Sequence, residues 1–395
     1  MSVEEKQMKK RNKNSRAAKR RRRRRIILGV ELFLILILAG VLYGYTKYGM
    51  MQKEEIPEED VIVNEIDDET TVEKEGYRNI ALFGVDSRTA GSLGEGNHSD
   101  CIIVASINNK TGDIKLVSVY RDTYLNQSTD SYNKATQAYF SGGPKQSINM
   151  LNMNLDLDIK DYVSVDFAAL VDVIDLLGGI EIDIQTADEV VHLNNYAIET
   201  SKVTGVKTTK VKKPGLQVLD GVQATSYARI RYTAGDDFRR TERQREVIEK
   251  IIEKAKTANV VTLNKVINEV FPQVSTSLSI KELIALVPNA AKYSISETAG
   301  FPFDKTTGTV GKRGSCVIAQ GLEQNVVQLH EFLFGEKDYQ PSATVTQINN
   351  KIIKDTGVKA LIKEETEEET DEETDDSGDS KSTTGSSTKT STSKN

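Results

Sequence analysis

Six arginines lie between residues 227 and 246 of a chain whose formal net charge is −6. The guanidinium group is a planar fork of donors that fits phosphate oxygens, so such a cluster in an acidic protein indicates an anion site. Arg229 and Arg231 alternate in the stretch SYARIRY, which as a strand would place both side chains on one face. Arg240 and Gln244 are four residues apart at the head of a predicted helix, so they share one helical face.

Arg239 and Arg243 are also four residues apart, on a neighbouring line of the same predicted helix. The helix is amphipathic over 238–259, and an amphipathic helix presents a polar face to solvent. We therefore expect these two arginines to be exposed surface charges rather than site residues.

A second group of polar residues stands where predicted strands begin or end. Asp86 and Arg88 follow ALFGV, Asp100 precedes CIIVASI, and Arg121 and Asp122 follow IKLVSVY. Each of them alone is readily explained as a loop charge, but strand ends are where α/β proteins usually build sites. Two carboxylates near a phosphate are a typical Mg²⁺ environment, because the cation removes the repulsion between the carboxylates. The combined set predicts a pyrophosphate site with Mg²⁺ at its edge.

Familiar catalytic motifs are missing from the sequence. It contains no GxxxxGK[ST] loop, no GxGxxG after a strand and no GxSxG turn, which argues against kinases, dinucleotide enzymes and serine hydrolases. His98, His192 and His330 form no zinc-ligand pattern with the two cysteines. The spacing of Cys101 and Cys316 leaves their pairing open.

The elements that position these residues alternate along the chain. Strands are predicted at 77–88, 101–108 and 114–122, the last two joined by the turn NKTGD. Residues 161–177 are predicted to form a helix that stops at Gly178-Gly179 and leads into another strand. Strands that alternate with helices predict an α/β fold.

The N-terminal part of the chain indicates a membrane anchor. Residues 1–25 hold thirteen Lys/Arg against two Glu, and residues 26–45 form an apolar run with one charge, which is long enough to span a bilayer. The basic segment predicts a cytoplasmic N-terminus, with everything after residue 45 outside. A cleaved signal peptide is the alternative for the apolar run, and nucleic-acid binding is the alternative for the basic segment. We expect topogenic charge and no nucleic-acid partner.

The remaining chain divides by composition. Residues 46–76 are acidic and predict a stalk, residues 77–340 predict the folded part, and residues 364–395 hold eleven acidic residues and no apolar one. A segment of that composition cannot bury a core, so we expect a disordered tail.

Five blocks in chain order resemble the LytR-CpsA-Psr family over about residues 77–255: LFGVDSR, SDCIIVASINNKTGDIKLVSVYRDTYL, YNKATQAYFSGG, DYVSVDFAALVDVIDLLGGIEIDI and LQVLDGVQATSYARIRYTAGDDFRRTERQREVI. The resemblance implies one domain with a central mixed sheet flanked by helices, with 256–340 as an extension packed on it. It also implies an extracellular, membrane-anchored phosphotransferase of Gram-positive bacteria. Such enzymes move an anionic glycopolymer, such as teichoic acid or capsule, from a polyprenyl-pyrophosphate donor to a muramic acid C6 hydroxyl of peptidoglycan.

The resemblance also implies roles for individual residues. The metal, Mg²⁺ or Mn²⁺, is assigned to Asp86 and Asp100. The helix at 161–177 is a candidate wall for an apolar tunnel that holds the lipid. Pyrophosphate binding is assigned to Arg88, Arg121, Lys134, Arg229, Arg231, Arg240 and Gln244, and catalysis to Arg121, Asp122, Arg229 and Arg231.

Some points stay open at this stage. Asp122 is either a general base or a salt-bridge partner. Tyr120 stands where the family usually has proline, and Cys101 where threonine is common, but neither change removes a charged residue. A non-catalytic membrane-bound regulator of envelope genes and a phosphatase acting on the same lipid are the alternative functions.

Overall fold

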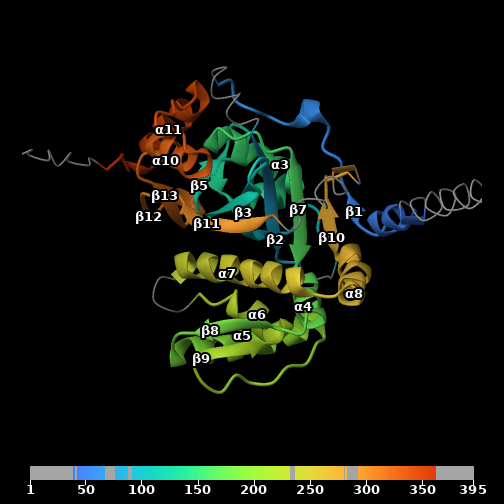
Figure 1. Cartoon of the computed structure of the whole chain (residues 1–395). Helices are drawn as coiled ribbons and strands as arrows, with labels where there is room; N and C mark the ends of the chain where they lie inside the picture. The colour runs from blue at the N-terminus through green and yellow to red at the C-terminus, as the bar shows by residue number, and fades with distance from the viewer. Residues whose placement is uncertain are drawn as a thin grey trace, which may run out of the picture. The chain divides into compact units, whose positions relative to one another are not determined.

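The computed structural model describes residues 39–40, 42–66, 76–87, 91–231, 236–279, 281–282 and 292–361. Its centre is a seven-stranded sheet with the order β1-β10-β7-β2-β3-β4-β11 (Figure 1). The strands of this sheet are β1 (Gln52–Lys53), β2 (Tyr77–Val85), β3 (Ser99–Asn108), β4 (Asp113–Val119), β7 (Asp161–Asp166), β10 (Val274–Thr276) and β11 (Ser294–Phe301).

The sheet is mixed, as expected. β2 pairs antiparallel with β3, and β3 antiparallel with β4, whereas β7 runs parallel to β2 and β11 parallel to β4. The predicted turn between β3 and β4 is confirmed: the Asn108 side chain accepts hydrogen bonds from the backbone N–H groups of Lys110 and Thr111. The α/β fold with a central mixed sheet flanked by helices is therefore confirmed.

One face of the sheet is covered by helices α3, α10 and α11 and by two small hairpins. Ile102 and Val104 of β3 point to this side and are fully buried in the largest apolar cluster of the described residues. The covering elements are α3 (Thr136–Leu155), α10 (Leu322–Phe334), α11 (Ala343–Thr356), β5 (Tyr124–Asn126), β6 (Tyr132–Lys134), β12 (Lys305–Thr309) and β13 (Ser315–Ala319). We call this side the packed face.

The opposite face of the sheet is spanned by the long helix α7, beneath which lie α4, α5 and α6 and the β8–β9 hairpin (Figure 1). Cys101 and Ile103 of β3 point to this side, as the alternation of strand residues requires. The elements are α4 (Phe167–Leu176), α5 (Ala187–Thr204), α6 (Gly221–Tyr227), α7 (Asp236–Thr257), α8 (Val260–Val270), β8 (Ile180–Ile184) and β9 (Gly215–Leu219). We call this side the cavity face, and α4, α5, α6 and the β8–β9 hairpin the lower layer.

The prediction of a helix from residue 161 is wrong for its first six residues, which form β7. DYVSVD alternates half-buried and buried side chains with the period of two that a strand requires. Helix α4 begins only at Phe167, because the Asp166 side chain accepts the N–H of Ala169 and caps it. The helix stops before Gly178, as predicted.

The prediction of a strand at SYARIRY is also wrong. The preceding residues form α6, whose start is fixed by a capping box between Asp220 and Gln223. Two further turns follow, since the N–H of Arg229 donates to the Ser226 carbonyl and that of Ile230 to the Tyr227 carbonyl. Local capping therefore overrides the alternating pattern.

The expected stalk packs along the domain wherever it is described. β1 pairs parallel with β10 at one edge of the sheet. The N–H of Ile62 donates to the Asn149 side chain, and the Asn64 side chain donates to Asp156. Residues 67–75 lie outside the described residues, as does the predicted tail at 364–395.

Most of the apolar run at 26–45 and all of the basic segment at 1–25 lie outside the described residues. Within the described part of the chain, no helix combines the length and the apolar character needed to cross a bilayer. The expected extension at 256–340 contributes β10 and β11 to the central sheet, which joins it to residues 77–255 in one fold.

Candidate functional site

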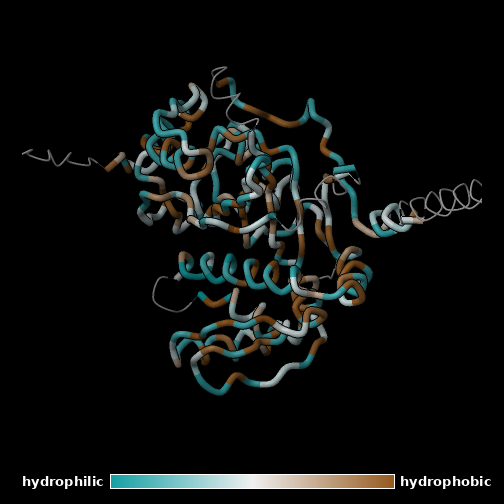
Figure 2. The backbone as a smooth tube through the Cα atoms, viewed as in Figure 1, coloured by the Kyte–Doolittle hydropathy of each residue, from teal (hydrophilic) through white to brown (hydrophobic). Residues whose placement is uncertain are grey.

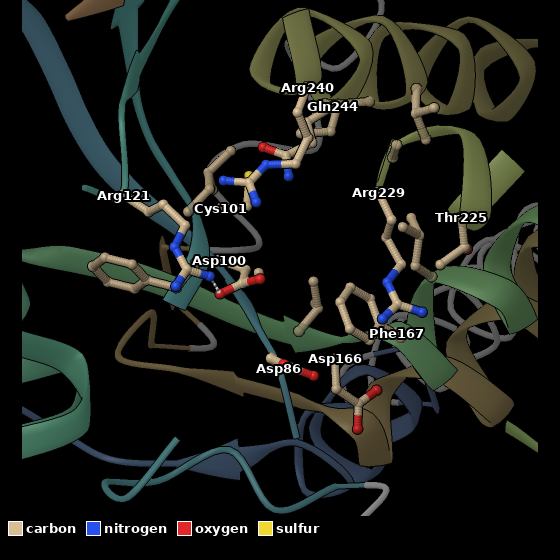
Figure 3. Close-up of a pocket in the computed structure, with 18 of the residues that line it drawn as sticks. Asp86, Asp100, Cys101, Arg121, Asp166, Phe167, Thr225, Arg229, Arg240 and Gln244 are labelled. Carbon is tan, nitrogen blue, oxygen red and sulfur yellow. Dashed lines mark hydrogen bonds and ion pairs between the residues drawn. The ribbon is translucent and has the colours of Figure 1, made fainter. Parts of the chain in front are cut away.

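A cavity of about 390 Å³ lies between the cavity face of the sheet and helices α4, α6 and α7 (Figure 3). Its charged lining residues and Gln244 come from distant parts of the sequence. These are Asp86, Asp100, Arg121, Asp166, Arg229, Arg231, Arg240 and Gln244. The structure thus brings together most of the residues that the sequence predicts.

The remaining wall of the cavity is largely apolar. The sheet contributes Leu82, Val163 and Val165, and the helices contribute residues that include Leu170 and Ile248. The expectation that the segment at 161–177 forms a wall is confirmed in position, although the wall is part strand and part helix. A cavity with one charged side and one apolar side fits an amphiphile with an anionic head.

Asp100 reaches this cavity through an irregularity in β3. Regular alternation would place it beside Ile102, on the packed face. The pairing of β2 with β3 shifts between Gly84 and Val85: Gly84 pairs with Cys101 and Val85 with Ser99, so Asp100 is bulged. Bulges next to functional sites often re-aim a side chain in this way.

Gly84 permits the close approach of the two strands at the bulge. A Cβ at this position would lie 2.8 Å from the Cβ of Cys101, closer than real side chains approach. The glycine therefore supports the local geometry that carries Asp100.

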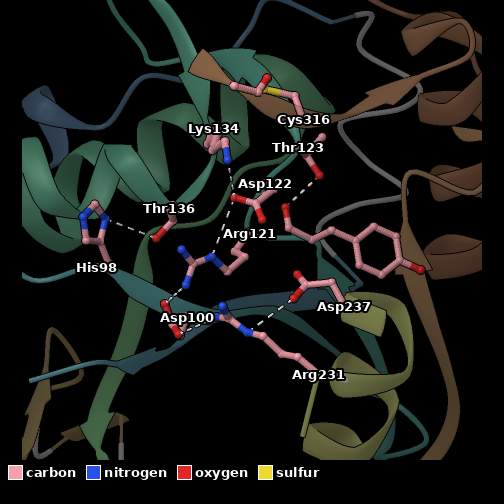
Figure 4. Close-up of polar contacts among 12 residues, drawn as sticks. His98, Asp100, Arg121, Asp122, Thr123, Lys134, Thr136, Arg231, Asp237 and Cys316 are labelled. Atoms are coloured by element: carbon pink, nitrogen blue, oxygen red, sulfur yellow. Dashed lines mark hydrogen bonds and ion pairs between the residues drawn. The ribbon is translucent and has the colours of Figure 1, made fainter. Parts of the chain in front are cut away.

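Asp100 is held between two arginines (Figure 4). One carboxylate oxygen pairs with Nη1 of Arg121, and the other lies 3.1 Å from Nη2 of Arg231. The Arg231 Nε atom also lies 3.6 Å from Asp237, whose other oxygen accepts a 2.9 Å hydrogen bond from Arg240. This alternating chain of charges fixes three guanidinium groups around one side of the cavity.

Arg240 is almost fully buried, and burial lowers the pKa of its guanidinium although Asp237 opposes that shift. Its Nε atom and the Oε1 atom of Gln244 are buried and have no hydrogen-bond partner among the described residues. Both side chains line the cavity. Since buried polar groups are normally paired, these atoms indicate a polar ligand group.

Arg229 lies on the other side of the cavity from Arg121 (Figure 3). Its guanidinium stands over the rings of Phe167 and Tyr196, at 4.6 and 5.4 Å from the ring centroids. Its Nη1 and Nη2 atoms donate to Thr200 and Glu199 at 3.0 and 3.2 Å. Arg229 and Arg231 thus share the cavity but not the single strand face that the sequence predicted.

Asp86 follows β2 directly and is exposed at the polar side of the cavity. Its carboxylate forms no ion pair or hydrogen bond with the described residues. Asp86 and Asp100 supply only oxygen donors, which suits Mg²⁺ or Mn²⁺ shared with ligand phosphates. No group of three His, Cys, Asp or Glu side chains with metal-site geometry occurs in the described ranges.

Asp122 and Lys134 lie next to the cavity but do not line it (Figure 4). The Lys134 ammonium is 3.1 Å from Asp122, and the same oxygen is 3.7 Å from the Arg121 Nε atom. This arrangement favours a supporting role for Asp122 behind Arg121. Arg88 lies outside the described residues.

The expectation that Arg239 and Arg243 are both exposed is wrong for Arg243. Arg243 is only 1% exposed and donates to the buried Glu189 at 2.6 Å, whereas Arg239 is partly exposed and pairs with Glu242. Residues of the lower layer cover α7 at Arg243, which the sequence period alone does not reveal. Arg243 joins α7 to α5 and so helps to hold the lower layer on α7.

Cys101 and Cys316 are both free. Burial raises the pKa of the Cys101 thiol to about 12, so it is a neutral part of the cavity wall. The sequence-based reasoning missed Asp237, which holds Arg231 and Arg240, and the ring of Tyr196 beneath Arg229. Asp237 stands three residues before Arg240 on the predicted helix, a spacing that could have indicated the pair.

Comparisons with known proteins agree on the family. The model described as the LytR_cpsA_psr family matches residues 38–325. The chain is 30% identical over 207 residues to TagU of Enterococcus faecalis, named as a polyisoprenyl-teichoic acid–peptidoglycan teichoic acid transferase, with 52% of this chain and 62% of TagU covered. It is 31% identical over 226 residues to biofilm regulatory protein A of Streptococcus mutans, with 54% of this chain and 53% of that protein covered.

The chain therefore spans between about half and two thirds of the length of these curated relatives. The fold is shared with a crystal structure described as a transcriptional regulator from Enterococcus faecalis. That comparison gives a TM-score of 0.54 and 23% identity, with 74% of this chain and 99% of that one covered.

Proposed function

Since the chain belongs to the LytR_cpsA_psr family, we propose that it is a membrane-anchored extracellular phosphotransferase. It transfers an anionic glycopolymer from a polyprenyl-pyrophosphate donor to peptidoglycan. The observation that carries this proposal is a cavity that combines arginines and aspartates with an apolar wall. The name of the Enterococcus faecalis relative supports the reaction class.

The donor fits the two sides of the cavity. A pyrophosphate carries negative charge that Arg121, Arg229 and Arg231 can contact from different directions, while the polyprenyl chain lies against Leu170, Ile248 and their apolar neighbours. The buried Nε–H of Arg240 gains an acceptor when a phosphate oxygen enters, whereas the Oε1 atom of Gln244 can accept from a hydroxyl of the glycan or acceptor. An uncharged sugar would not use the several guanidinium groups that line the cavity, and a simple lipid would leave all of its polar groups unused.

The reaction breaks the phosphoanhydride bond of the donor and forms a phosphoester bond to the acceptor. The muramic acid C6 hydroxyl attacks the phosphorus that carries the glycan, the bond from that phosphorus to the bridging oxygen breaks, and polyprenyl phosphate leaves. The hydroxyl proton passes to the leaving phosphate or to solvent. Arginines held in place before the reaction stabilise the negative charge that develops on the phosphoryl oxygens, which is usually the largest contribution to catalysis.

The remaining assigned residues support this arrangement. Asp86 and Asp100 would hold Mg²⁺ or Mn²⁺, which when bound offers a Lewis acid to the phosphoryl oxygens. Asp100 also orients Arg121 and Arg231. Asp122 acts as a positioning residue, because it contacts Arg121 and Lys134 rather than the cavity.

The deciding experiment is transfer of a defined lipid-linked donor to peptidoglycan oligomers, with Mg²⁺ and after its removal by chelation. We expect glycopolymer on the peptidoglycan and release of polyprenyl phosphate, both lost without the cation and in Asp86→Asn. Release of polyprenyl phosphate without transfer would identify a phosphatase. Donor binding without any turnover would favour a regulatory protein, the class in which the Streptococcus mutans relative is named.

A further inference from the structure

The corner between α7 and α8 exposes apolar side chains that the cavity does not use. Val260 and Val261, at the start of α8, are 82% and 68% exposed. Residues 254–265 contain Lys254, Lys256 and Lys265 and no acidic residue. An exposed apolar tip with basic residues around it is the composition of a segment that lies in a membrane interface.

The position of this corner is fixed by contacts with the helical segment at 42–48. The Tyr43 hydroxyl donates to the Asn264 side chain, and the Lys47 ammonium donates to the Asn268 side chain. Both pairs are separated by 221 positions, so the two helices run in the same direction and in constant register. Continued one helical turn toward the N-terminus, the same offset of 221 positions places Val260 level with Ala39 and Val261 level with Gly40.

Ala39 and Gly40 belong to the apolar run at 26–45 that the sequence assigns to the membrane. They precede its end by about five residues, and at about 1.5 Å per residue this is roughly 8 Å along the helix. Interfacial helices bury their apolar face about 5–10 Å into the boundary between head groups and acyl chains. The exposed Tyr43 and Tyr45 rings have the amphipathic character typical of that depth.

We propose that the corner at 254–265 is a membrane-contact surface that inserts Val260 and Val261 into an anionic lipid bilayer beside the anchor. The three lysines face the lipid phosphates, where each basic side chain adds electrostatic attraction. The proposal rests on the membrane anchor of the proposed function and adds a second point of contact. The anchor and the corner together fix the orientation of the domain relative to the bilayer, whereas the anchor alone would leave the domain free to tilt.

This orientation bears on how the donor enters. Helix α8 packs through Val266 and Val270 against Ala169 and Val173 of α4. Phe167 and Leu170 of the same helix line the cavity. The apolar wall of the cavity is therefore one helix away from the surface that we assign to the bilayer, where a lipid-linked donor resides.

The chain contains no tryptophan, so a single introduced tryptophan reports its own environment. We would reconstitute the full chain with Val261→Trp into vesicles of phosphatidylglycerol and phosphatidylcholine that contain brominated lipid. The matched control is Ile198→Trp on α5, since Ile198 is 67% exposed and Val261 68%. We expect blue-shifted emission, strong bromine quenching and little acrylamide quenching for Val261→Trp only. Equal acrylamide access for the two variants would overturn the proposal.

The lipid charge is tested with the same probe. Replacing Lys254, Lys256 and Lys265 by glutamine should weaken bromine quenching of the Val261→Trp probe in anionic vesicles. Purely zwitterionic vesicles should weaken the quenching even when all three lysines are present. Unchanged quenching in both cases would contradict the assignment of an anionic surface.

Transfer assays separate this inference from the proposed function. Val260→Ser/Val261→Ser should lower transfer severalfold with donor in vesicles and leave it unchanged with donor in detergent, whereas Val191→Ser/Ile198→Ser on α5 should change neither. An unchanged rate in vesicles would contradict the inference. If the wild-type chain transferred nothing while Val261→Trp was still quenched by lipid, the proposed function would fail and the membrane contact would stand.

Discussion

The two faces of the central sheet are built in opposite ways. On the packed face, Ile102 and Val104 are enclosed by α3, α10 and α11 in one apolar cluster. On the cavity face, Asp100 and Cys101 of the same strand line a cavity of about 390 Å³, which the buried Arg240 of α7 also lines (Figure 3). Figure 2 shows that α7, which lies across the cavity face, is largely hydrophilic. One strand thus contributes both to a closed core and to the cavity, through its alternation and through the bulge at Asp100.

The difference teaches where this fold places its polar groups. The packed face is stabilised by removing apolar surface from water, which is insensitive to pH. The lower layer is joined to α7 partly by the buried ion pair between Glu189 and Arg243, which is specific in geometry and depends on charge. The predictions below separate these two kinds of support, from the largest effect to the smallest.

Breaking the buried pair between Glu189 and Arg243 should have the largest effect. Removing one partner of a buried ion pair typically costs about 3–5 kcal/mol, because the other charge is left without compensation. Glu189→Gln should therefore lower the free energy of unfolding by about that amount, measured by denaturant titration. Glu242→Gln, which breaks the partly exposed pair with Arg239, is the control and should stay within about 1 kcal/mol.

The same pair predicts a pH dependence. Burial raises the pKa of Glu189, but its bonds from Arg243 and from backbone N–H groups outweigh this and hold the pKa below the ordinary value of 4.5. A depressed carboxyl pKa contributes stability above 4.5 that is lost as pH falls through the folded-state value. Wild-type stability should drop in that acidic range more steeply than that of Glu189→Gln, and parallel curves would contradict this role.

Truncation of matched isoleucines compares the two faces directly. Ile102→Ala on the packed face should cost about 2–5 kcal/mol, because it opens a new void in a closed core. Ile248→Ala on the cavity wall should cost at or below about 2 kcal/mol, since this side chain is only half-buried and already borders a cavity. Thermal unfolding of both variants measures the difference, and a costlier Ile248→Ala would mean that the cavity is closed in solution.

Arginine-to-lysine substitutions test whether geometry or charge matters at the cavity. Arg231→Lys keeps the charge but loses the fork that reaches Asp100 and the donor, so transfer should fall about 10²–10³-fold, or about 2–4 kcal/mol. Arg239→Lys should stay within about 0.5 kcal/mol, since Arg239 lies outside the cavity lining. Equal losses would indicate that only general positive charge is required.

The smallest expected effect is that of Asp122→Asn. The change weakens the support of Arg121 from behind, so kcat should fall about tenfold, which is about 1.4 kcal/mol. KM and the unfolding temperature should stay unchanged, and Asp122→Glu should restore most of the rate. A loss near 10³-fold that glutamate restored only above its own pKa would instead identify Asp122 as a general base.

The sequence carried the chemistry of the site further than its geometry. Residue type and strand-end position were sufficient to select Asp86, Asp100 and Arg121, which the structure brings to one cavity. The alternation in SYARIRY led to the wrong prediction of a strand. The capping box at Asp220 starts a helix there, and hydrophobic periodicity does not detect such a cap. Arg229 and Arg231 nevertheless line one cavity, because side chains that come from turns can also converge.

Other features depend on contacts that sequence period does not encode. The bulge that re-aims Asp100 arises from a register shift between two strands, so only the paired structure shows it. The burial of Arg243 follows from α5 packing over a line of α7 that its own pattern marks as polar. Both are tertiary effects on residues whose local sequence predicts something else.

The most direct test of the two-face account is to locate the lipid of the donor. A polyprenyl-pyrophosphate analogue with a photoreactive group on its chain would be irradiated with the full-length protein, and the adducts mapped by mass spectrometry. The account predicts adducts on cavity-face residues such as Leu82, Leu170 and Ile248, with the yield reduced in Arg231→Lys. Adducts confined to the packed face or to surface residues, with a yield unaffected by Arg231→Lys, would contradict it.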